Sequence, residues 1–443
     1  MSSSGRPAAP LRVVLAGVGT VGGGVVEVLA RNGQRIEERA GRSIELVGIA
    51  DLDQDKASLL AQGRCPVFAD AKEMLLQTRP DVLVELIGGC TYARSLVIAA
   101  IEAGVHVVTA NKALLAVHGN EIFPAAESKG VQVGFEAAVA GGIPIIKALR
   151  EGLAANEIES VAGIINGTTN FILSEMRDKG LGFAEVLAQA QQLGYAEADP
   201  TFDVEGVDAA HKITLLAAIA FGMPPAFEMA HIEGISQLQA QDIGHAEQLG
   251  YRIKLLGIAR RRPEGIELRV HPTLVPAKRL IANVEGAMNA VLVKGDAVGH
   301  TLYYGKGAGS QPTASAVIAD LIDLARQLDA PMGARVPHLG VHPKSRRSLP
   351  VLPVSEAVSG YYLRLRVADQ PGVLADVTRV LASEGISIDA FIQREPGDAS
   401  GQTDVMLITH TCREASVLKA LDQLRALPTV LAQPVWLRVE SFA

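Results

Sequence analysis

The chain has 443 residues, too many for one ordinary hydrophobic core, so two or three domains are expected. Hydrophobic residues make up 48% of the chain and charged residues 20%, a balance typical of globular proteins that excludes a mainly disordered chain. The formal net charge of −7 argues against binding to nucleic acid or to an anionic membrane, so small metabolites are the expected partners.

The cysteines are widely spaced and form no Cys-x-x-Cys pair; they are Cys65, Cys90 and Cys412. Neither a disulfide framework nor a zinc site is predicted, and a reducing cytoplasm fits best. Residues 1–7 carry no apolar segment, and no run of about 18 apolar residues follows. We therefore expect neither a secretion signal nor a membrane span.

Short apolar runs alternate with helical patterns over residues 11–135. Runs of strand length cover 11–15, 44–50, 81–87, 105–109 and 131–135. The first helix is expected from Val25 to about Arg31, with a loop from Gln34 to Gly41. Strands that alternate with helices predict an α/β domain with a Rossmann-type, doubly wound parallel sheet.

A second domain, of α+β class, is expected over residues 136–307. Its predicted elements are a strand at 161–165, helices at 170–176 and 183–193, an acidic loop at 194–203 and a helix at 207–221. The last helix has no charged residue after Lys212, which predicts burial on nearly all sides. A helix at 314–328, within a segment of about 308–330, is expected to return to the first domain.

Residues 331–358 are predicted to be a linker, because five prolines between 331 and 353 interrupt any periodicity. Residues 359–443 then follow a βαββαβ pattern. Its strands are expected at 362–367, 386–393, 403–409 and 435–439, and its helices near 373–384 and 414–424. This order predicts a compact ferredoxin-like domain.

A glycine motif, Gly17-x-Gly19-x-x-Gly22, lies between the first strand and the first helix. Such glycines let the backbone approach a pyrophosphate at a helix N-terminus. The residues between them are expected to share the dinucleotide contacts; they are Val18, Thr20 and Val21.

Asp51 ends the second predicted strand, where a carboxylate binds a ribose diol and repels a 2′-phosphate. Leu52 offers no charge to such a phosphate. These residues favour NAD over NADP, although nearby Lys56 leaves both cofactors open.

Asn111 and Lys112 follow a predicted parallel strand, at the sheet edge where ligands bind. The alternative is a solvated lysine at the start of a helix. Asp208 and Lys212 share one face of an otherwise apolar helix, and such a pair is costly to bury unless it is compensated or used. The alternative here is a structural ion pair near the solvated N-terminal end of the helix.

The acidic loop and its surroundings concentrate carboxylates that could bind an ammonium group; they are Glu197, Asp199, Asp203 and Glu205. The alternative is an ordinary solvated loop.

Six segments together resemble homoserine dehydrogenases, over about residues 11–330. They are Gly17–Gly22, Thr109–Ala116, Glu136–Pro144, Gly163–Leu173, Tyr195–Lys212 and Gly305–Gly309. The resemblance implies interconversion of L-aspartate 4-semialdehyde and L-homoserine with NAD or NADP. It also implies that Lys212 donates the proton and that Asp208 orients it.

The resemblance assigns further sites. Lys112 would contact cofactor and substrate, Glu197 and Asp203 would bind substrate, and Gly307 would contact the cofactor. A loop matching the family's monovalent-cation site would bind Na⁺ or K⁺; its residues are Glu136, Val139, Gly141 and Ile143. A homodimer or homotetramer is expected.

Residues 361–443 resemble an ACT domain, whose turn after the first strand binds an amino-acid effector. The matching residues are Asp369, Gln370, Gly372 and Val373. Because homoserine is a precursor of threonine, threonine is the expected effector. The alternative is a dimerisation module without a ligand.

Two other functions compete with this interpretation. A phosphorylating semialdehyde dehydrogenase would need a thiol nucleophile, for which Cys90 is the candidate. A non-catalytic amino-acid sensor would not need the lysines and carboxylates named above, and their presence argues against it.

Overall fold

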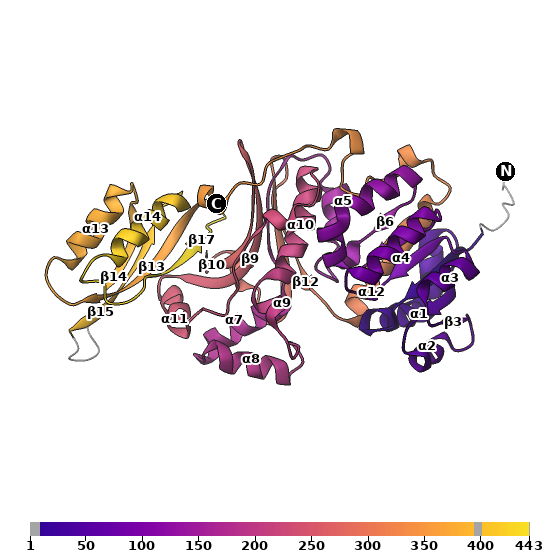
Figure 1. The fold of residues 1–443 in the computed structure, drawn as a ribbon, viewed down its shortest axis with the longest axis horizontal. Helices are drawn as coiled ribbons and strands as arrows, with labels where there is room; N and C mark the ends of the chain where they lie inside the picture. The colour runs from indigo at the N-terminus through magenta and orange to yellow at the C-terminus, as the bar shows by residue number, and fades with distance from the viewer. Residues whose placement is uncertain (1–8, 394–400, 443) are drawn as a thin grey trace.

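We describe residues 9–393 and 401–442 in a computed structural model. Three parts follow one another along the long axis of Figure 1: the N-terminal part in indigo and purple, a central part, and the C-terminal part in yellow. Among the described residues, no helix is long and apolar enough to cross a membrane.

The N-terminal part contains a six-stranded parallel sheet in the order β3-β2-β1-β4-β5-β6, which confirms the predicted Rossmann-type architecture. Its strands are β1 Leu11–Ala16, β2 Ile44–Ala50, β3 Val67–Phe68, β4 Val82–Glu85, β5 His106–Thr109 and β6 Val133–Gly134. Its helices are α1 Thr20–Ala40, α2 Gln54–Ala61, α3 Ala71–Thr78, α4 Thr91–Glu102 and α5 Lys112–Lys129.

Helix α1 is longer than predicted, and the expected loop from Gln34 to Gly41 was wrong. The helix continues because Ile36 and Ala40 remain buried, while the polar residues between them face solvent. It ends at Gly41, whose φ of 79° allows its N–H to donate to the Glu37 carbonyl oxygen at 2.8 Å.

Helix α12, Ser310–Gln327, packs along α1. Its buried side chains Val317 and Leu321 share a core with Leu11 and Val25. The chain thus returns to the first sheet after passing through the central part.

The central part is built on strands of an eleven-stranded sheet, in which nine strands follow the order β12-β11-β7-β9-β10-β17-β13-β15-β14, while β8 pairs with β10 and β16 with β13. The central strands are β7 Ile158–Ile164, β8 His231–Ile232, β9 Tyr251–Arg262, β10 Gly265–Pro276, β11 Met288–Gly295 and β12 Gly299–Lys306. Of these strands, the sequence pattern predicts only β7.

Helices cover the central sheet; they are α7 Gly167–Lys179, α8 Phe183–Gln192, α9 Thr201–Val204, α10 Val207–Phe221 and α11 Ala240–Gln248. Helix α10 is buried along nearly its whole length, as its composition predicted. Helix α7 starts three residues earlier than expected, because the Asn166 side chain accepts the Thr169 N–H at 2.8 Å and caps it. Short helical turns precede β7: η1 Glu136–Ala138, α6 Ile145–Lys147 and η2 Ala148–Gly152.

The C-terminal part has the predicted βαββαβ order. Its main elements are β13 Val358–Ala368, α13 Val373–Ser383, β14 Ile388–Gln393, β15 Gln402–Thr409, α14 Glu414–Arg425 and β17 Val435–Val439, with the short β16 Cys412–Arg413. Its last strand also pairs with the central part, because Thr273 and Leu274 of β10 lie beside Arg438 and Val439 of β17. One sheet therefore runs through both parts.

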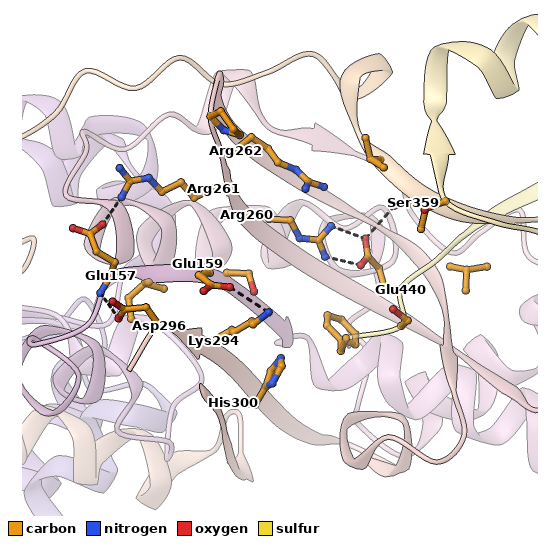
Figure 2. A pocket seen from close by; sticks show the side chains of 18 residues that line it. Glu157, Glu159, Arg260, Arg261, Arg262, Lys294, Asp296, His300, Ser359 and Glu440 are labelled. Carbon is orange, nitrogen blue, oxygen red and sulfur yellow. Dashed lines mark hydrogen bonds and ion pairs between the residues drawn. The ribbon is translucent and has the colours of Figure 1, made fainter. Parts of the chain in front are cut away.

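Buried ion pairs reinforce this joint. Glu440 accepts from Arg260 and from Arg269 of the central strands, each at 2.6 Å, and from the Ser359 hydroxyl at 3.1 Å. Figure 2 shows Arg260, Glu440 and Ser359 at the edge of a cavity of about 690 Å³ between the two parts.

The segment predicted to be a linker contains only short turns, η5 Met332–Ala334, η6 Pro343–Ser345 and η7 Val354–Glu356. It is nevertheless fixed to both larger parts. The ring of His338 accepts the Val133 N–H at 3.0 Å, and Arg346 pairs with Glu127 of α5. The Ile266 N–H donates to the Pro350 carbonyl oxygen at 2.8 Å.

Candidate active site

The glycine turn has the geometry of a phosphate cradle. Gly17 has φ 96°, and a Cβ there would lie 2.6 Å from the Leu86 carbonyl oxygen. A Cβ on Gly22 would collide with the Gly17 carbonyl oxygen, whereas Gly19 faces open space at the start of α1. The N–H groups of the first helical turn are therefore open to an anion.

Asp51 follows β2 and accepts the N–H groups of Val18 at 2.6 Å and Asp53 at 2.9 Å. It lines a cavity of about 600 Å³ together with Gly17, Gly19, Ala50, Leu52, Ala69, Asp70, Ala71, Leu86, Ile87 and Tyr92. None of these described lining residues is basic. The cavity therefore suits hydroxyl groups better than a second phosphate.

Asp70 and Tyr92 were not predicted as part of this site. The Tyr92 hydroxyl donates to Asp70 at 3.1 Å, and Asp70 also caps α3. Asp70 lies two residues after the short strand β3, which the sequence pattern did not predict, so no local signal identified it.

Two lysines meet at one carboxylate. Nζ of Lys212 lies 2.7 Å from Oδ2 of Asp208 on the preceding turn of α10, and Nζ of Lys112 lies 3.2 Å from Oδ1. Lys212 also donates to the Ile165 carbonyl oxygen at 2.8 Å. The structure thus brings together the three residues that the sequence analysis named as catalytic candidates.

Asp208 is buried, and burial alone would raise the pKa of its carboxyl group. The positive charges of Lys212 and Lys112, with hydrogen bonds from Lys212 and Asn166, outweigh that effect and hold the pKa below its ordinary value. The carboxylate stays ionised near neutral pH. Lys212 and Lys112 therefore flank one ionised carboxylate, and the neighbouring Asp203 adds a second acidic side chain to the cluster.

Asn166 was not predicted as a site residue. Its Nδ2 donates to Asp203 at 2.7 Å and to Asp208 at 2.8 Å, so it links the acidic loop to the catalytic candidates. Burial, followed by the nearby Asp208 charge, raises the pKa of Asp203. Only the Asn-Gly-Thr-Thr-Asn segment signalled this residue, and that segment gave no role for it.

Glu197 lies on the exposed loop between α8 and α9. Its backbone carbonyl accepts from Gln191 at 3.0 Å, while its side chain faces solvent. Of the two predicted substrate carboxylates, Asp203 is therefore the one hydrogen-bonded into the lysine cluster.

The predicted cation loop is compact and buried. The carboxylate of Glu136 accepts the N–H groups of Ile146 at 2.9 Å and Lys147 at 2.8 Å, and burial raises its pKa. The Glu136 N–H donates to Asp320, whose pKa rises to about 7 through burial and then the Glu136 charge.

Backbone packing completes this loop. A Cβ on Gly141 would lie 2.6 Å from the Gly307 carbonyl oxygen, so Gly307 packs against the loop. Val139 and Ile143 are buried beside it. Among the described residues, no group of three or more His, Cys, Asp or Glu side chains could hold a metal. Backbone carbonyls with one carboxylate are hard oxygen ligands and fit Na⁺ or K⁺.

The predicted effector turn borders a cavity of about 380 Å³, lined by Val367, Ala368, Asp369, Gln370, Pro371, Gly372, Val373, Leu374, Gln393 and Val405. Gly372 has φ 96° and precedes α13 without a side-chain cap. Gln393 of β14 donates to Asp369 at 3.4 Å. The four predicted effector residues thus line one cavity.

Cys90 precedes α4, and burial followed by the Glu85 charge raises the pKa of its thiol. A nucleophile would need the opposite shift, so a thiol-dependent semialdehyde dehydrogenase is disfavoured.

Comparison with known proteins decides between the remaining functions. The model of the homoserine dehydrogenase family matches residues 144–322, and that of its NAD-binding domain matches residues 17–136. A homoserine dehydrogenase from Pseudomonas aeruginosa is 56% identical over 432 residues, covering 98% of this chain and 99% of the relative. The chain belongs to the homoserine dehydrogenase family. It is an oxidoreductase, which confirms the activity that the sequence implied.

Solved structures agree with this assignment. A homoserine dehydrogenase from Thiobacillus denitrificans matches with a TM-score of 0.93 and 59% identity, covering 98% of this chain and 99% of that one. A hyperthermophilic archaeal homoserine dehydrogenase in complex with NADPH matches with a TM-score of 0.61 and 25% identity, covering 73% of this chain and 99% of that one. The ACT-domain model matches residues 361–429, which confirms the C-terminal domain type.

Proposed function

We propose that this homoserine dehydrogenase interconverts L-aspartate 4-semialdehyde and L-homoserine, in the aspartate pathway to threonine, methionine and isoleucine. The proposal rests on one cluster, in which Lys112 and Lys212 both pair with Asp208. This cluster lies at the same edge of the parallel sheet as the glycine turn. Ligands bind at this edge in parallel α/β sheets.

When bound, the nicotinamide cofactor would supply a hydride to the aldehyde carbon, and the carbonyl oxygen would then need a proton. Lys212 donates that proton, since an ammonium group has three N–H donors and two are held by Asp208 and Ile165. Asp208 keeps the ammonium oriented. Lys112, bound to the other oxygen of Asp208, contacts cofactor and substrate.

Glu197 and Asp203 bind the substrate ammonium group. Asp203 is linked to the lysine cluster through Asn166, and the exposed side chain of Glu197 would turn toward the bound substrate. A carboxylate beside an ammonium group provides the charge-assisted pairing that such recognition needs.

A direct assay tests the reaction. Purified enzyme is supplied with the semialdehyde and either NADH or NADPH, and the product is identified by mass spectrometry. We expect consumption of the reduced cofactor matched by homoserine, and the reverse reaction from homoserine with the oxidised cofactor. Cofactor consumption without homoserine, or no consumption with either cofactor, would overturn the assignment.

We infer that the cofactor is NAD(H) in preference to NADP(H), because Asp51 and Asp70 both line the cavity beside the glycine turn. The archaeal relative was solved in complex with NADPH, so NADP(H) is the alternative cofactor. The residues at the turn that would contact either cofactor are Gly17, Val18, Gly19, Thr20, Val21 and Gly22.

We infer that Na⁺ or K⁺ binds at the loop of Glu136, Val139, Gly141 and Ile143, through backbone carbonyls and the Glu136 carboxylate. Gly307 packs on this loop, so the cation would also order the segment that leads into α12. Activity in a buffer whose only cation is tetramethylammonium should fall, and KCl should restore it.

Feedback inhibition by threonine through the ACT domain is our third proposal. Asp369 would accept from the effector ammonium, and the start of α13 at Gly372 and Val373 would receive its carboxylate, with Gln370 beside it. A purely structural module is the alternative.

We propose that the functional units are residues 11–135 with 308–330, 136–307, a linker at 331–358, and 359–443. A homodimer or homotetramer in the cytoplasm is the expected form. Light scattering after gel filtration would give its mass, and a monomer would contradict this expectation.

A further inference from the structure

A second cavity beside the sheet edge, of about 400 Å³, has one wall from another part of the chain. Its lining from the N-terminal part is Val21, Leu86, Ile87, Gly88, Gly89, Ala110, Asn111, Lys112 and Ala113. The remaining described lining residue is Phe202, from α9 of the central part. An aromatic ring therefore faces the edge of the parallel sheet across this space.

Phe202 is held in place by other aromatic rings. Its centroid lies 5.3 Å from that of His211 on α10, and His211 in turn lies 4.2 Å from Phe227. Nζ of Lys112 lies 6.0 Å from the Phe202 centroid. Phe202 is 42% exposed, and it lines the cavity while its ring contacts that of His211.

This cavity adjoins the one that contains Asp51, because Leu86 and Ile87 line both. The shared wall lies next to Gly17 of the phosphate cradle. An elongated ligand with a flat group at each end, joined by a pyrophosphate, therefore has a place for both ends. The end beyond Asp51 would meet Phe202.

We propose that Phe202, which belongs to the central part, forms one wall of the site for the nicotinamide half of the cofactor. Its side chain packs directly against the nicotinamide ring. The proposal rests on the cofactor site inferred above. An aromatic ring adds affinity for a flat heteroaromatic group without hydrogen bonds, so it serves the oxidised and the reduced cofactor alike. Phe202 also joins the two parts of the molecule, because it reaches the cofactor edge from α9, the helix that carries Asp203.

Binding of two ligands separates this role from a general effect on the fold. NADH carries both halves of the cofactor, and ADP-ribose lacks the nicotinamide. We would measure the Kd of each by calorimetry for the wild-type enzyme and for Phe202→Ala, Phe202→Tyr and Leu193→Ala. Leu193 is a matched control, because it is 65% exposed at the end of α8 and lines neither cavity.

We expect Phe202→Ala to weaken NADH binding about three- to tenfold and to leave ADP-ribose binding unchanged, since an aromatic pair contributes on that scale. Phe202→Tyr should retain affinity, and Leu193→Ala should match the wild type. Bound NADH should also lose part of its fluorescence enhancement in Phe202→Ala.

Equal NADH affinity in the wild type and Phe202→Ala would overturn the proposal. Equal losses for NADH and ADP-ribose would overturn it as well, because Phe202 would then act on the fold of the site. Failure of the wild type to bind ADP-ribose would instead contradict the inferred cofactor site.

Discussion

Lys112 and Asp208 come from different parts of the molecule, yet Nζ of Lys112 lies 3.2 Å from Oδ1 of Asp208. Lys112 opens α5, directly after Asn111, which caps that helix by accepting the Leu114 N–H at 3.1 Å. Asp208 stands on the buried helix α10, one turn before Lys212. The cluster therefore exists only while the N-terminal and central parts lie against each other.

Cofactor preference should respond to residue 52. Leu52 is 92% exposed at the edge of the cavity that contains Asp51, so Leu52→Arg should add a positive charge without disturbing the fold. The ratio of kcat/KM for NADPH to that for NADH should rise about tenfold, which is about 1.4 kcal/mol. Leu59→Arg, exposed on α2 outside this cavity, is the control. An unchanged ratio for Leu52→Arg would place the ribose elsewhere.

Substrate affinity should depend on the acidic loop. Glu197→Ala should raise the KM for homoserine, because the variant lacks a carboxylate for the substrate ammonium group, while the KM for the cofactor stays the same. An effect of about tenfold is expected for one exposed charge-assisted contact. Steady-state kinetics provide the measurement, and an unaltered KM for homoserine would remove Glu197 from the substrate site.

The threonine response should depend on the turn before α13. Deleting the ACT domain is a poor test, because it would remove β17 from β10 and leave Arg269 without Glu440. Asp369→Ala avoids this loss. We expect it to weaken inhibition by threonine at least tenfold and to keep the uninhibited kcat. Asp376→Ala, at a half-buried position of α13 where Asp376 pairs with Arg379, should behave as wild type.

Calorimetry on the wild-type enzyme completes this test. Heat of threonine binding that disappears in Asp369→Ala would support the assigned site. No heat at millimolar threonine would contradict the proposed effector.

The joint between β10 and β17 should weaken in acid. Burial raises the pKa of Glu440, but the charges of Arg269 and Arg260 and their hydrogen bonds have the larger, opposite effect. The net result is a pKa of about 2, below the ordinary value of a glutamate. A depressed pKa stabilises the folded state above the unfolded value of about 4.3, and that contribution is lost as the pH falls toward 2.

Glu440→Gln should therefore lower the stability at pH 7 by about 3 kcal/mol and flatten its dependence on pH between about 5 and 2. Melting temperatures across this range would measure both effects. Glu185→Gln, exposed on α8, is the control. A wild-type slope retained in Glu440→Gln would mean that other groups govern the acid response.

Local patterns explain what the sequence predicted well. The parallel strands, the glycine turn and the helix with Asp208 and Lys212 depend on residues close together in the chain, so their periodicity and spacing suffice. The length of α1 was missed because its polar face resembles a loop when the buried Ile36 and Ala40 are not yet known.

Long-range contacts explain what was missed. Asn166 joins the site through hydrogen bonds to Asp203 and Asp208, which are 37 and 42 residues away in the sequence. Phe202 is placed at a cavity whose other lining residues come mainly from the segments that follow β4 and β5. The strands at 251–306 depend on antiparallel partners and on β17. No local sequence pattern predicts the pairing of β17 with β10.

We propose that Lys212, oriented by Asp208, donates the proton in a nicotinamide-dependent reduction. Single-turnover reduction of the semialdehyde by Lys212→Ala, with its Kd for NADH, tests this most directly. We expect a rate about 10²- to 10⁴-fold below wild type with an unchanged Kd, because a general acid contributes on that scale. Lys129→Ala, exposed at the end of α5, should match the wild type. Retention of more than about a tenth of the wild-type rate by Lys212→Ala would contradict the assignment.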